Sequence, residues 1–360
     1  MQSKCTNKYA VIRMVLRSSA WGGLLMAMSL LNLQAERAAN LSGKDRHTEN
    51  QLTSHLEGCA IFPSDNIWNT PIDCSPVDDH SALFIETIGA GTGLHADFGS
   101  GLWKGEPIGI PYVTVPGEQP GVSISFKYDD ESDPGPYPIP PDAPIEGGSD
   151  RHVLVLDRDR CILYEVFAAF RQEDGSWRAG SGAVFNLQSQ ALRPAGWTSA
   201  DAAGLPILPG LVRYDEVAAG EITHALRFTA PRTRREYIWP ARHYASSRIE
   251  IQYPPMGQRF RLRANFDMSG FSQEGQVIMR ALQKYGMFLA DNGSAWFISG
   301  VPDERWNNEA LSADFRRVKG VDFEAIDEFS LQMDTDSGQA RGCVKDSNEV
   351  VHVPLGHDDE

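Results

Sequence analysis

Long hydrophobic runs are nearly absent from this chain of 360 residues, and only one apolar segment approaches the length of a membrane span. A multi-span membrane protein is therefore excluded. Positive charge is also scarce, because 33 Lys and Arg face 48 Asp and Glu, for a net charge of −15. A free nucleic-acid-binding domain is not expected from this balance. The hydrophobic fraction of 41% still suffices for a folded core, which excludes a disordered chain.

Motifs of several enzyme and metal-binding classes are missing as well. The sequence contains no GxSxG, HExxH, Walker A or dinucleotide-binding glycine pattern. It has no CxxC or HxxxH spacing for zinc and no complete DxDxDG calcium loop. An exported esterase or peptidase would therefore lack its nucleophile motif, and no motif identifies the reaction.

The N-terminal segment has the charge order of an export signal. Four basic residues and no acidic residue precede or flank an apolar stretch at 20–31, and Leu33, Gln34 and Ala35 resemble a signal peptidase site. We expect residues 1–35 to be a signal peptide and the protein to be secreted, either extracellular or periplasmic, without a membrane span after cleavage. An uncleaved anchor is the alternative, although the apolar stretch is shorter than a span requires.

No Ser-, Gly- or charge-rich linker interrupts the remaining chain. We expect a polar spacer at 36–57, a single β-rich domain at 58–332, and an acidic tail at 333–360. Four cysteines lie outside the signal, at 59, 74, 161 and 343, and they allow three pairings. Cys59 with Cys74 would close a short loop worth ~3 kcal/mol, and Cys161 with Cys343 would then tie the tail to the body. A zinc site is the competing interpretation.

Strand signals dominate the expected domain, because short β-branched or aromatic runs are bounded by Gly, Pro, Asp or Asn. We predict strands at 108–115, 122–128, 152–157, 161–170, 222–229, 259–263, 287–290 and 295–299. Hairpins are predicted at Arg158–Arg160 and at the Asn-Gly turn of Asp291–Ser294. Helices are predicted at 81–88, 210–219 and 273–285. The fold class is therefore mainly β, an antiparallel β-sandwich or jelly roll with a few short peripheral helices.

Two stretches depart from the average composition. Six prolines fall between positions 134 and 144, after an acidic run. This segment is either a solvated surface loop or the rigid rim of a cleft, and Asp129, Asp130, Glu131 or Asp133 offers weak support for calcium. Residues 227–263 contain nine arginines against two glutamates. Three roles are open for these arginines. They bind substrate anions, or they pair with the acidic loops of the protein. Alternatively, the solvated face of one strand consists of Arg259, Arg261 and Arg263.

Tryptophan side chains are common in the expected domain, and they stack well on the apolar faces of sugars. They lie at 68, 103, 177, 197, 239, 296 and 306. Most tryptophans of a β protein belong to its core, but Trp197 and Trp306 are in loop-like contexts and are the better sugar platforms. Arg242, His243 and Tyr244 are candidates for further substrate contacts.

Candidate acids and bases are scattered rather than clustered. Glu165 and His224 interrupt apolar strands, where burial raises the pKa of a carboxylate toward that of a general acid. Asp291 lies at the end of a strand, and these three residues are the candidate catalytic set. His95, Asp97, His152 and Asp267 have strand or turn positions that also suit ordinary structural roles.

Two segments, Gly196 to Pro206 and Ala281 to Gly293, resemble a group of secreted, largely uncharacterised bacterial proteins, some of which carry carbohydrate-binding modules. The resemblance covers about residues 59–330 and implies export and contact with glycans, without a catalytic residue to transfer. We therefore expect a secreted carbohydrate-active enzyme that cleaves a polysaccharide or oligosaccharide, as a glycoside hydrolase in preference to a lyase. The alternative is a non-catalytic glycan-binding or cell-envelope protein. No cofactor is expected beyond the weak calcium signal.

Overall fold

The β-branched and aromatic runs predicted as strands form eight of the seventeen strands in the described residues. The structure, a computed structural model, describes residues 54–343, of which 27% are in strands or bridges and 18% in helices. The mainly β content predicted from the sequence is confirmed. The strands are β1 (His55–Leu56), β2 (Cys59–Ala60), β3 (His95–Asp97), β4 (Leu102–Trp103), β5 (Glu106–Pro107), β6 (Tyr112–Val115), β7 (Ile124–Phe126), β8 (Val153–Asp157), β9 (Ile162–Phe167), β10 (Phe170–Arg171), β11 (Trp177–Ala179), β12 (Ser181–Asn186), β13 (Leu226–Ala230), β14 (Arg259–Leu262), β15 (Met287–Asn292), β16 (Phe297–Ser299) and β17 (Phe323–Ala325).

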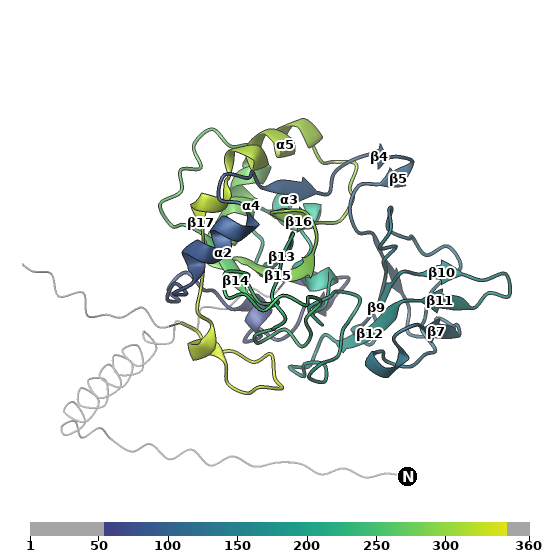
Figure 1. Cartoon of the computed structure of the whole chain (residues 1–360). Helices are drawn as coiled ribbons and strands as arrows, with labels where there is room; N and C mark the ends of the chain where they lie inside the picture. Colours follow the sequence, from purple (N-terminus) through teal and green to yellow (C-terminus); the bar gives the residue numbers. More distant parts are fainter. Residues whose placement is uncertain (1–53, 344–360) are drawn as a thin grey trace, which may run out of the picture. The chain divides into compact units, whose positions relative to one another are not determined.

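The largest sheet has the strand order β17-β14-β15-β13-β16-β3. Within it β13 is parallel to β15 and β16 is parallel to β3, whereas the other neighbours are antiparallel. Figure 1 shows helices α2 (Ser81–Ile88), α4 (Gln273–Lys284) and α5 (Asn308–Arg317) beside these strands, and they contact β17, β14 and β3, respectively. The sheet is therefore mixed, and a sandwich or jelly-roll arrangement stays a prediction.

Local sequence patterns predict the α-helices of the described residues except α5. Helix α4 begins after Ser272, whose side chain accepts a hydrogen bond from the Gly275 amide, and it buries the apolar face predicted for 273–285. Helix α3 (Tyr214–Ala219) is shorter than predicted because Leu208–Gly210 forms a separate 3₁₀ turn, η3. The sequence analysis missed α5, although Asn307 caps it. The other 3₁₀ turns are η1 (Ile67–Asn69), η2 (Asp129–Glu131), η4 (Gly320–Asp322) and η5 (Phe329–Leu331).

A second sheet, with the order β12-β9-β8-β6, is buried on both faces. Side chains alternate across a strand, so Leu154 and Leu156 of β8 face the main core, whereas Val153 and Val155 face a smaller core. A three-stranded sheet, β10-β11-β7, contributes Trp177 to the smaller core. Strand β8 thus belongs to both cores, which explains why the sequence shows no linker between them.

The proline-rich segment covers the smaller core. Residues 137–140 are buried, and Tyr137 and Ile139 pack with Val153 and Val155. The prediction of a solvated surface loop is wrong for these residues, because the six-proline run places apolar side chains against the sheet while its backbone stays outside any strand.

One of the two predicted hairpins is correct. β8 and β9 pair antiparallel across the Arg158–Arg160 turn. The second hairpin, at Asp291–Ser294, is wrong because β13 lies between β15 and β16 in the sheet. The Asn-Gly segment therefore connects strands that are not neighbours, and the chain passes over the end of β13.

The domain boundaries differ from those predicted. Ser54 is buried and β1 pairs with β2, so the folded body already includes residues 54–57 of the predicted spacer. Residues 333–343 of the predicted tail lie on the body, where Gln339 bridges Asn66 and Ser337 bridges Ala191. The predicted signal peptide, residues 36–53 of the predicted spacer and residues 344–360 of the predicted tail lie outside the described residues. No helix in the described range has both the length and the hydrophobicity to cross a bilayer.

Two disulfides are present, as predicted, but with a different pairing. Cys59 bonds to Cys161, and Cys74 bonds to Cys343. Cys59 is the first residue of β2, and Cys161 immediately precedes β9, so the first bond ties the N-terminal hairpin to the second sheet. The second bond ties residue 343 to the N-terminal part of the body instead of to Cys161. The pairing predicted from proximity in sequence is therefore wrong.

Candidate active site

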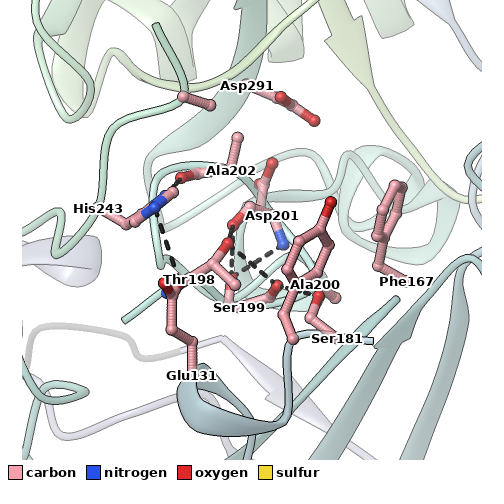
Figure 2. A pocket seen from close by; sticks show the side chains of 12 residues that line it. Glu131, Phe167, Ser181, Thr198, Ser199, Ala200, Asp201, Ala202, His243 and Asp291 are labelled. Atoms are coloured by element: carbon pink, nitrogen blue, oxygen red, sulfur yellow. Dashed lines mark hydrogen bonds and ion pairs between the residues drawn. The ribbon is translucent and has the colours of Figure 1, made fainter. Parts of the chain in front are cut away.

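A cavity of about 330 Å³ opens between the segment that follows β12 and the end of β15. Figure 2 shows its lining side chains, which include two aspartates, one glutamate and one histidine. None of the described lining residues is Lys or Arg. The lining consists of Tyr128, Glu131, Phe167, Ser181, Thr198, Ser199, Ala200, Asp201, Ala202, His243, Ala245 and Asp291.

Short hydrogen bonds hold the 198–202 segment that forms one wall. The Ser199 hydroxyl donates to the Leu205 carbonyl at 2.5 Å and accepts from the Asp201 amide at 2.9 Å. Ser181 on β12 donates to the Ser199 carbonyl at 2.7 Å, and the Nδ1 of His243 lies 2.8 Å from the Ala202 carbonyl. Because the wall is held on both sides, Asp201 has a defined position at the cavity.

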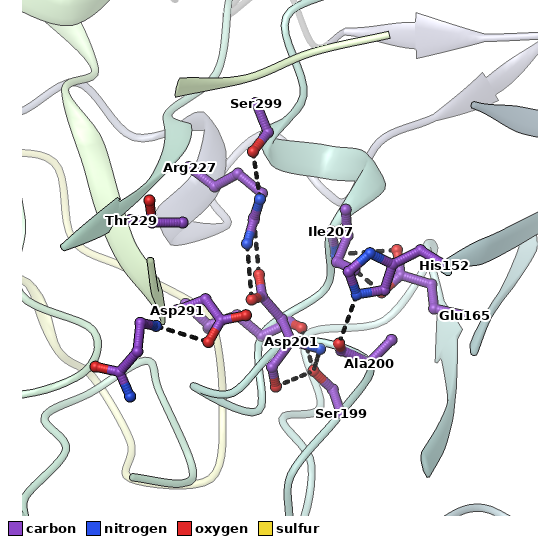
Figure 3. A network of polar contacts seen from close by, with 12 residues as sticks. His152, Glu165, Ser199, Ala200, Asp201, Ile207, Arg227, Thr229, Asp291 and Ser299 are labelled. Carbon is purple, nitrogen blue, oxygen red and sulfur yellow. Dashed lines mark hydrogen bonds and ion pairs between the residues drawn. The ribbon is translucent and has the colours of Figure 1, made fainter. Parts of the chain in front are cut away.

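Asp201 forms a two-point ion pair with Arg227 of β13. The Nε and Nη2 of Arg227 each donate to one carboxylate oxygen at 2.8 Å, and its Nη1 donates to the Ser299 hydroxyl on β16. Both side chains are buried. Burial raises the pKa of Asp201, and the Arg227 guanidinium opposes that rise. Figure 3 shows Arg227 between Ser299 and Asp201, with Asp291 on the other side of Asp201.

Asp291 is the residue of this group whose pKa lies near neutrality. Burial, together with the charge of Asp201, raises the pKa of Asp291 to about 7. One of its oxygens accepts the Asn292 amide at 2.6 Å, and the side chain lines the cavity. Because Arg227 binds both oxygens of Asp201, the negative charge of the pair resides on Asp201 and the proton on Asp291.

His152, immediately before β8, forms a buried ion pair behind the same wall. Its Nδ1 lies 2.5 Å from Glu146, and its Nε2 lies 3.0 Å from the Ala200 carbonyl. Burial opposes a charge on this imidazole, but the Glu146 carboxylate outweighs it and raises the pKa of His152 to about 9. A protonated His152 donates from both nitrogens, so it holds Ala200, the neighbour of Asp201, in place.

Folding stability is expected to fall as the pH rises from 6.5 to 9, because the folded protein binds a proton on His152 that the unfolded chain releases near pH 6.5. His152→Gln is expected to lose about 3 kcal/mol of unfolding free energy below pH 6.5. The difference from the wild type should shrink toward pH 9. Urea unfolding at a series of pH values measures this, with His80→Gln, at the surface, as the matched control. A difference that does not depend on pH would contradict a charged His152.

The three predicted catalytic residues do not lie together. Asp291 lines the cavity, but Glu165 and His224 do not. Glu165 is fully buried on β9, where it accepts the amides of Ile207 and Leu208 at 2.8 to 2.9 Å and anchors the start of η3. Burial raises its pKa to about 7. This carboxylate therefore has a complete structural role at a distance from the cavity wall.

His224 is fully buried in a separate polar cluster. Its Nε2 lies 3.1 Å from Glu216 and 3.0 Å from Arg213, and its Nδ1 lies 2.8 Å from the Ala225 carbonyl. Burial opposes the charge of Glu216, but Arg213 and His224 outweigh it and lower the pKa of Glu216 to about 2. The cluster joins α3 to β13, and nothing in it reaches the cavity.

The structure places some of the predicted substrate-binding residues at the cavity and others away from it. His243 lines the cavity, and Tyr244 stacks on it with ring centroids 5.7 Å apart. Trp197 is partly exposed and lies over Arg193, outside the cavity lining. Trp306 is wrong as an exposed platform, because it is 3% exposed and packs edge-on against Phe98 in the core.

The arginine-rich stretch pairs mostly with the protein's own acids. Arg242 donates to the Thr335 carbonyl and to Asp336, both at 2.6 Å, so it holds the described part of the tail instead of a substrate. Arg261 pairs with Glu324 at 2.8 Å. Arg259 pairs with Glu328 and is completely buried, so the prediction of one solvated face for the 259–263 strand is wrong.

The acidic run that offered calcium ligands is engaged by protein groups. Asp133 pairs with Arg193 and accepts the Val184 amide at 2.8 Å, and Glu131 accepts the Thr198 amide at 3.2 Å. Within residues 54–343, one group of side chains has the spacing of metal ligands, Asp73 with Cys74 and Cys343. The two sulfur atoms of that group form a disulfide, so it offers no thiolate.

Sequence analysis missed Asp201 and Arg227 as a functional pair and left His152 in a structural role. Asp201 lies four residues after Trp197, in the same loop that was considered for sugar stacking. Arg227 was one of nine arginines without a distinguishing feature. No local sequence pattern indicates that Asp201 and Arg227 pair, because the two residues are 26 positions apart. They meet only because the fold places the 198–202 segment beside β13.

Comparison with protein-family models, with curated proteins and with solved structures finds no match for this chain. The cavity and its charged side chains are therefore the features that indicate a function.

Proposed function

We propose that the protein is a carbohydrate-active enzyme that hydrolyses a glycosidic bond of a polysaccharide at this cavity. The observation that carries the proposal is the pair of carboxyl groups that line the cavity, with the pKa of Asp291 raised to about 7 and Asp201 held as a carboxylate by Arg227. Two carboxyl groups with separated protonation states are the arrangement that glycoside hydrolysis requires.

Each side chain has a role in this reaction. Asp291 donates its proton to the oxygen of the leaving sugar, which prevents the departure of an alkoxide. The Asp201 carboxylate stabilises the positive charge that develops on the sugar ring as the bond to the leaving oxygen breaks. A water molecule then adds to that ring carbon and gives one proton to the Asp291 carboxylate, which restores the acid. Arg227 and His152 are positioning residues, since they act through Asp201 and the Ala200 carbonyl. Glu131, Thr198 and His243 supply polar groups for the hydroxyls of the sugar.

Hydrolysis is favoured over elimination by the absence of cations among the described lining residues. A lyase neutralises the carboxylate of a uronic acid before a base removes the adjacent proton. Each nitrogen of Arg227 donates to Asp201 or Ser299, and Arg242 binds the tail. His224, a member of the predicted catalytic set, is buried in another cluster and supplies no base to this cavity.

Export is part of the proposal. Two disulfides in the described residues favour an oxidising compartment, either extracellular or periplasmic, and agree with the charge order of residues 1–35. A glycan outside the cytoplasm is then the natural substrate. The rival function is a non-catalytic glycan-binding or cell-envelope protein, in which the same cavity binds a sugar and cleaves nothing.

The purified protein is expected to release reducing ends from a neutral polysaccharide without the ultraviolet absorbance of an unsaturated uronate. The measurement uses a panel of neutral and acidic polysaccharides, with both signals recorded for each. Absorbance together with reducing ends would indicate a lyase. Retention on a polysaccharide without any cleavage across the panel would favour the binding protein and overturn the proposal.

A further inference from the structure

A second and larger cavity, of about 770 Å³, lies at the edge of the six-stranded sheet. Its walls come from β3, from the β4–β5 hairpin, from Gly147 and Gly148, and from the first turns of α5. None of these residues lines the first cavity. The second cavity is therefore a separate feature that the catalytic proposal leaves without a role.

Aromatic surface is available on two sides of this cavity. Trp103, on the β4–β5 hairpin, is 68% exposed although it lines the cavity. Opposite the hairpin, the imidazole of His95 stacks on Phe297 with ring centroids 3.9 Å apart. A large exposed indole at a cavity is a binding feature, because the same side chain would be buried if it served only the fold.

The polar groups of the second cavity are mainly carboxylates. Asp97, Glu106 and Glu146 line it together with one cation, Lys104. Burial lowers the pKa of His95, so its imidazole is neutral at neutral pH. No described residue forms a hydrogen bond or ion pair with the side chain of Asp97, whose oxygens are free to accept from hydroxyl or ammonium groups. The charge balance repels a uronic acid.

One side chain connects the two cavities. Glu146 lines the second cavity and pairs with the Nδ1 of His152, whose Nε2 contacts the carbonyl of Ala200 in the wall of the first. The chain of contacts from Glu146 to Ala200 therefore passes through a single imidazole.

We propose that the second cavity is a subsite for a neutral or amino-bearing sugar ring, with Trp103 as the stacking platform and Asp97 as the hydroxyl or ammonium acceptor. The inference rests on the proposed function, since the ring belongs to the same polysaccharide that is cleaved in the first cavity. The subsite therefore indicates the class of the substrate, which is a glycan without uronic acids that extends beyond the cleaved bond.

Affinity electrophoresis of the full chain in native gels tests the subsite without relying on cleavage. The gels contain hydroxyethyl cellulose, glycol chitosan or polygalacturonate, as neutral, cationic and uronate probes. The wild type is expected to be retarded by at least one of the first two probes and not by polygalacturonate. Trp103→Ala is expected to weaken that retardation about tenfold in the apparent Kd.

Leu102→Ala is the matched control, because Leu102 is 65% exposed on the same hairpin but does not line the cavity. Its retardation is expected to equal that of the wild type, and circular dichroism checks that both variants fold. Unchanged retardation of Trp103→Ala, an equal loss in Leu102→Ala, or no retardation of the wild type by the neutral and cationic probes would each overturn the subsite. Strong retardation by polygalacturonate would overturn its sugar class.

Reducing-end assays on Asp291→Asn separate the two proposals. If that variant still cleaves while Trp103→Ala loses binding, the catalytic assignment fails and the subsite stands. If Asp291→Asn loses cleavage while Trp103→Ala binds normally, the subsite fails and the catalytic assignment stands.

Discussion

Asp291→Asn is expected to lower kcat by about 10²- to 10⁴-fold, the contribution of a positioned general acid. The amide keeps the size of the side chain but has no acidic proton to give to the leaving oxygen. The wild type is expected to lose activity as the pH rises through about 7, where Asp291 loses its proton. Residual activity of the variant should lack this decline on the basic side. Reducing-end release measured over a pH series provides both results.

Asp201→Asn tests the second half of the pair. The substitution removes the negative charge beside Asp291 and leaves Arg227 without its two-point partner. We expect a comparable loss of kcat and, because the neighbouring charge is gone, a basic limb of the pH profile that shifts to lower pH. Asp267→Asn, at an exposed position, is the matched control and should leave activity unchanged. Full activity of Asp291→Asn with a normal pH profile would refute the assignment of the general acid.

Arg259→Met is expected to destabilise the protein by about 3–5 kcal/mol, the range for removing one partner of a buried ion pair. Arg259 is fully buried on β14, and it donates to the Tyr285, Ile67 and Thr70 carbonyls at 2.7, 3.1 and 3.0 Å. It also pairs with Glu328 at 3.3 Å. Methionine fills most of the space but donates to none of these four acceptors, so their hydrogen bonds to Arg259 are lost in the core. Urea unfolding monitored by tryptophan fluorescence measures the loss.

The matched control is the same substitution at Arg263, four residues further along the chain. Arg263 is exposed just after β14 and pairs with Glu324 at 3.1 Å. Arg263→Met is expected to change stability by less than about 1 kcal/mol, because exposed ion pairs contribute little. Equal stability of the two variants would show that the buried contacts of Arg259 do not hold η1 and η5 to the sheet.

Local pattern predicted those parts of the fold that depend on neighbours in sequence. Strand β8, the turn at Arg158–Arg160 and strand β9 were predicted together, because a hairpin is closed by a few residues. The amphipathic run of α4 and its cap at Ser272 were equally visible. The Asn-Gly turn at 292–293 failed for the opposite reason, since β13 inserts between the two strands from a position about 60 residues earlier, and no local signal records that.

In the candidate site, too, the sequence predicts what depends on neighbouring residues and not what depends on distant segments. Asp291 was predicted from its position at a strand end, and the structure places it at the cavity. Glu165 was chosen as an acid inside an apolar strand, but the amides of residues 207 and 208 supply its partners. A carboxylate in an apolar strand must be buried with a partner, and the sequence does not say whether that partner is a backbone amide or a substrate.

By itself the sequence determined the mainly β composition, the positions of eight of the seventeen strands and three of the four α-helices in the described range, and the presence of two disulfides. Only the tertiary structure decided which cysteines pair, that Arg259 is buried while Arg263 is exposed, and that Asp201, paired with Arg227, lines the same cavity as Asp291. The physical reason is that hydrophobic periodicity acts within one element, whereas burial, protonation and ion pairing depend on the segments that surround a side chain in space.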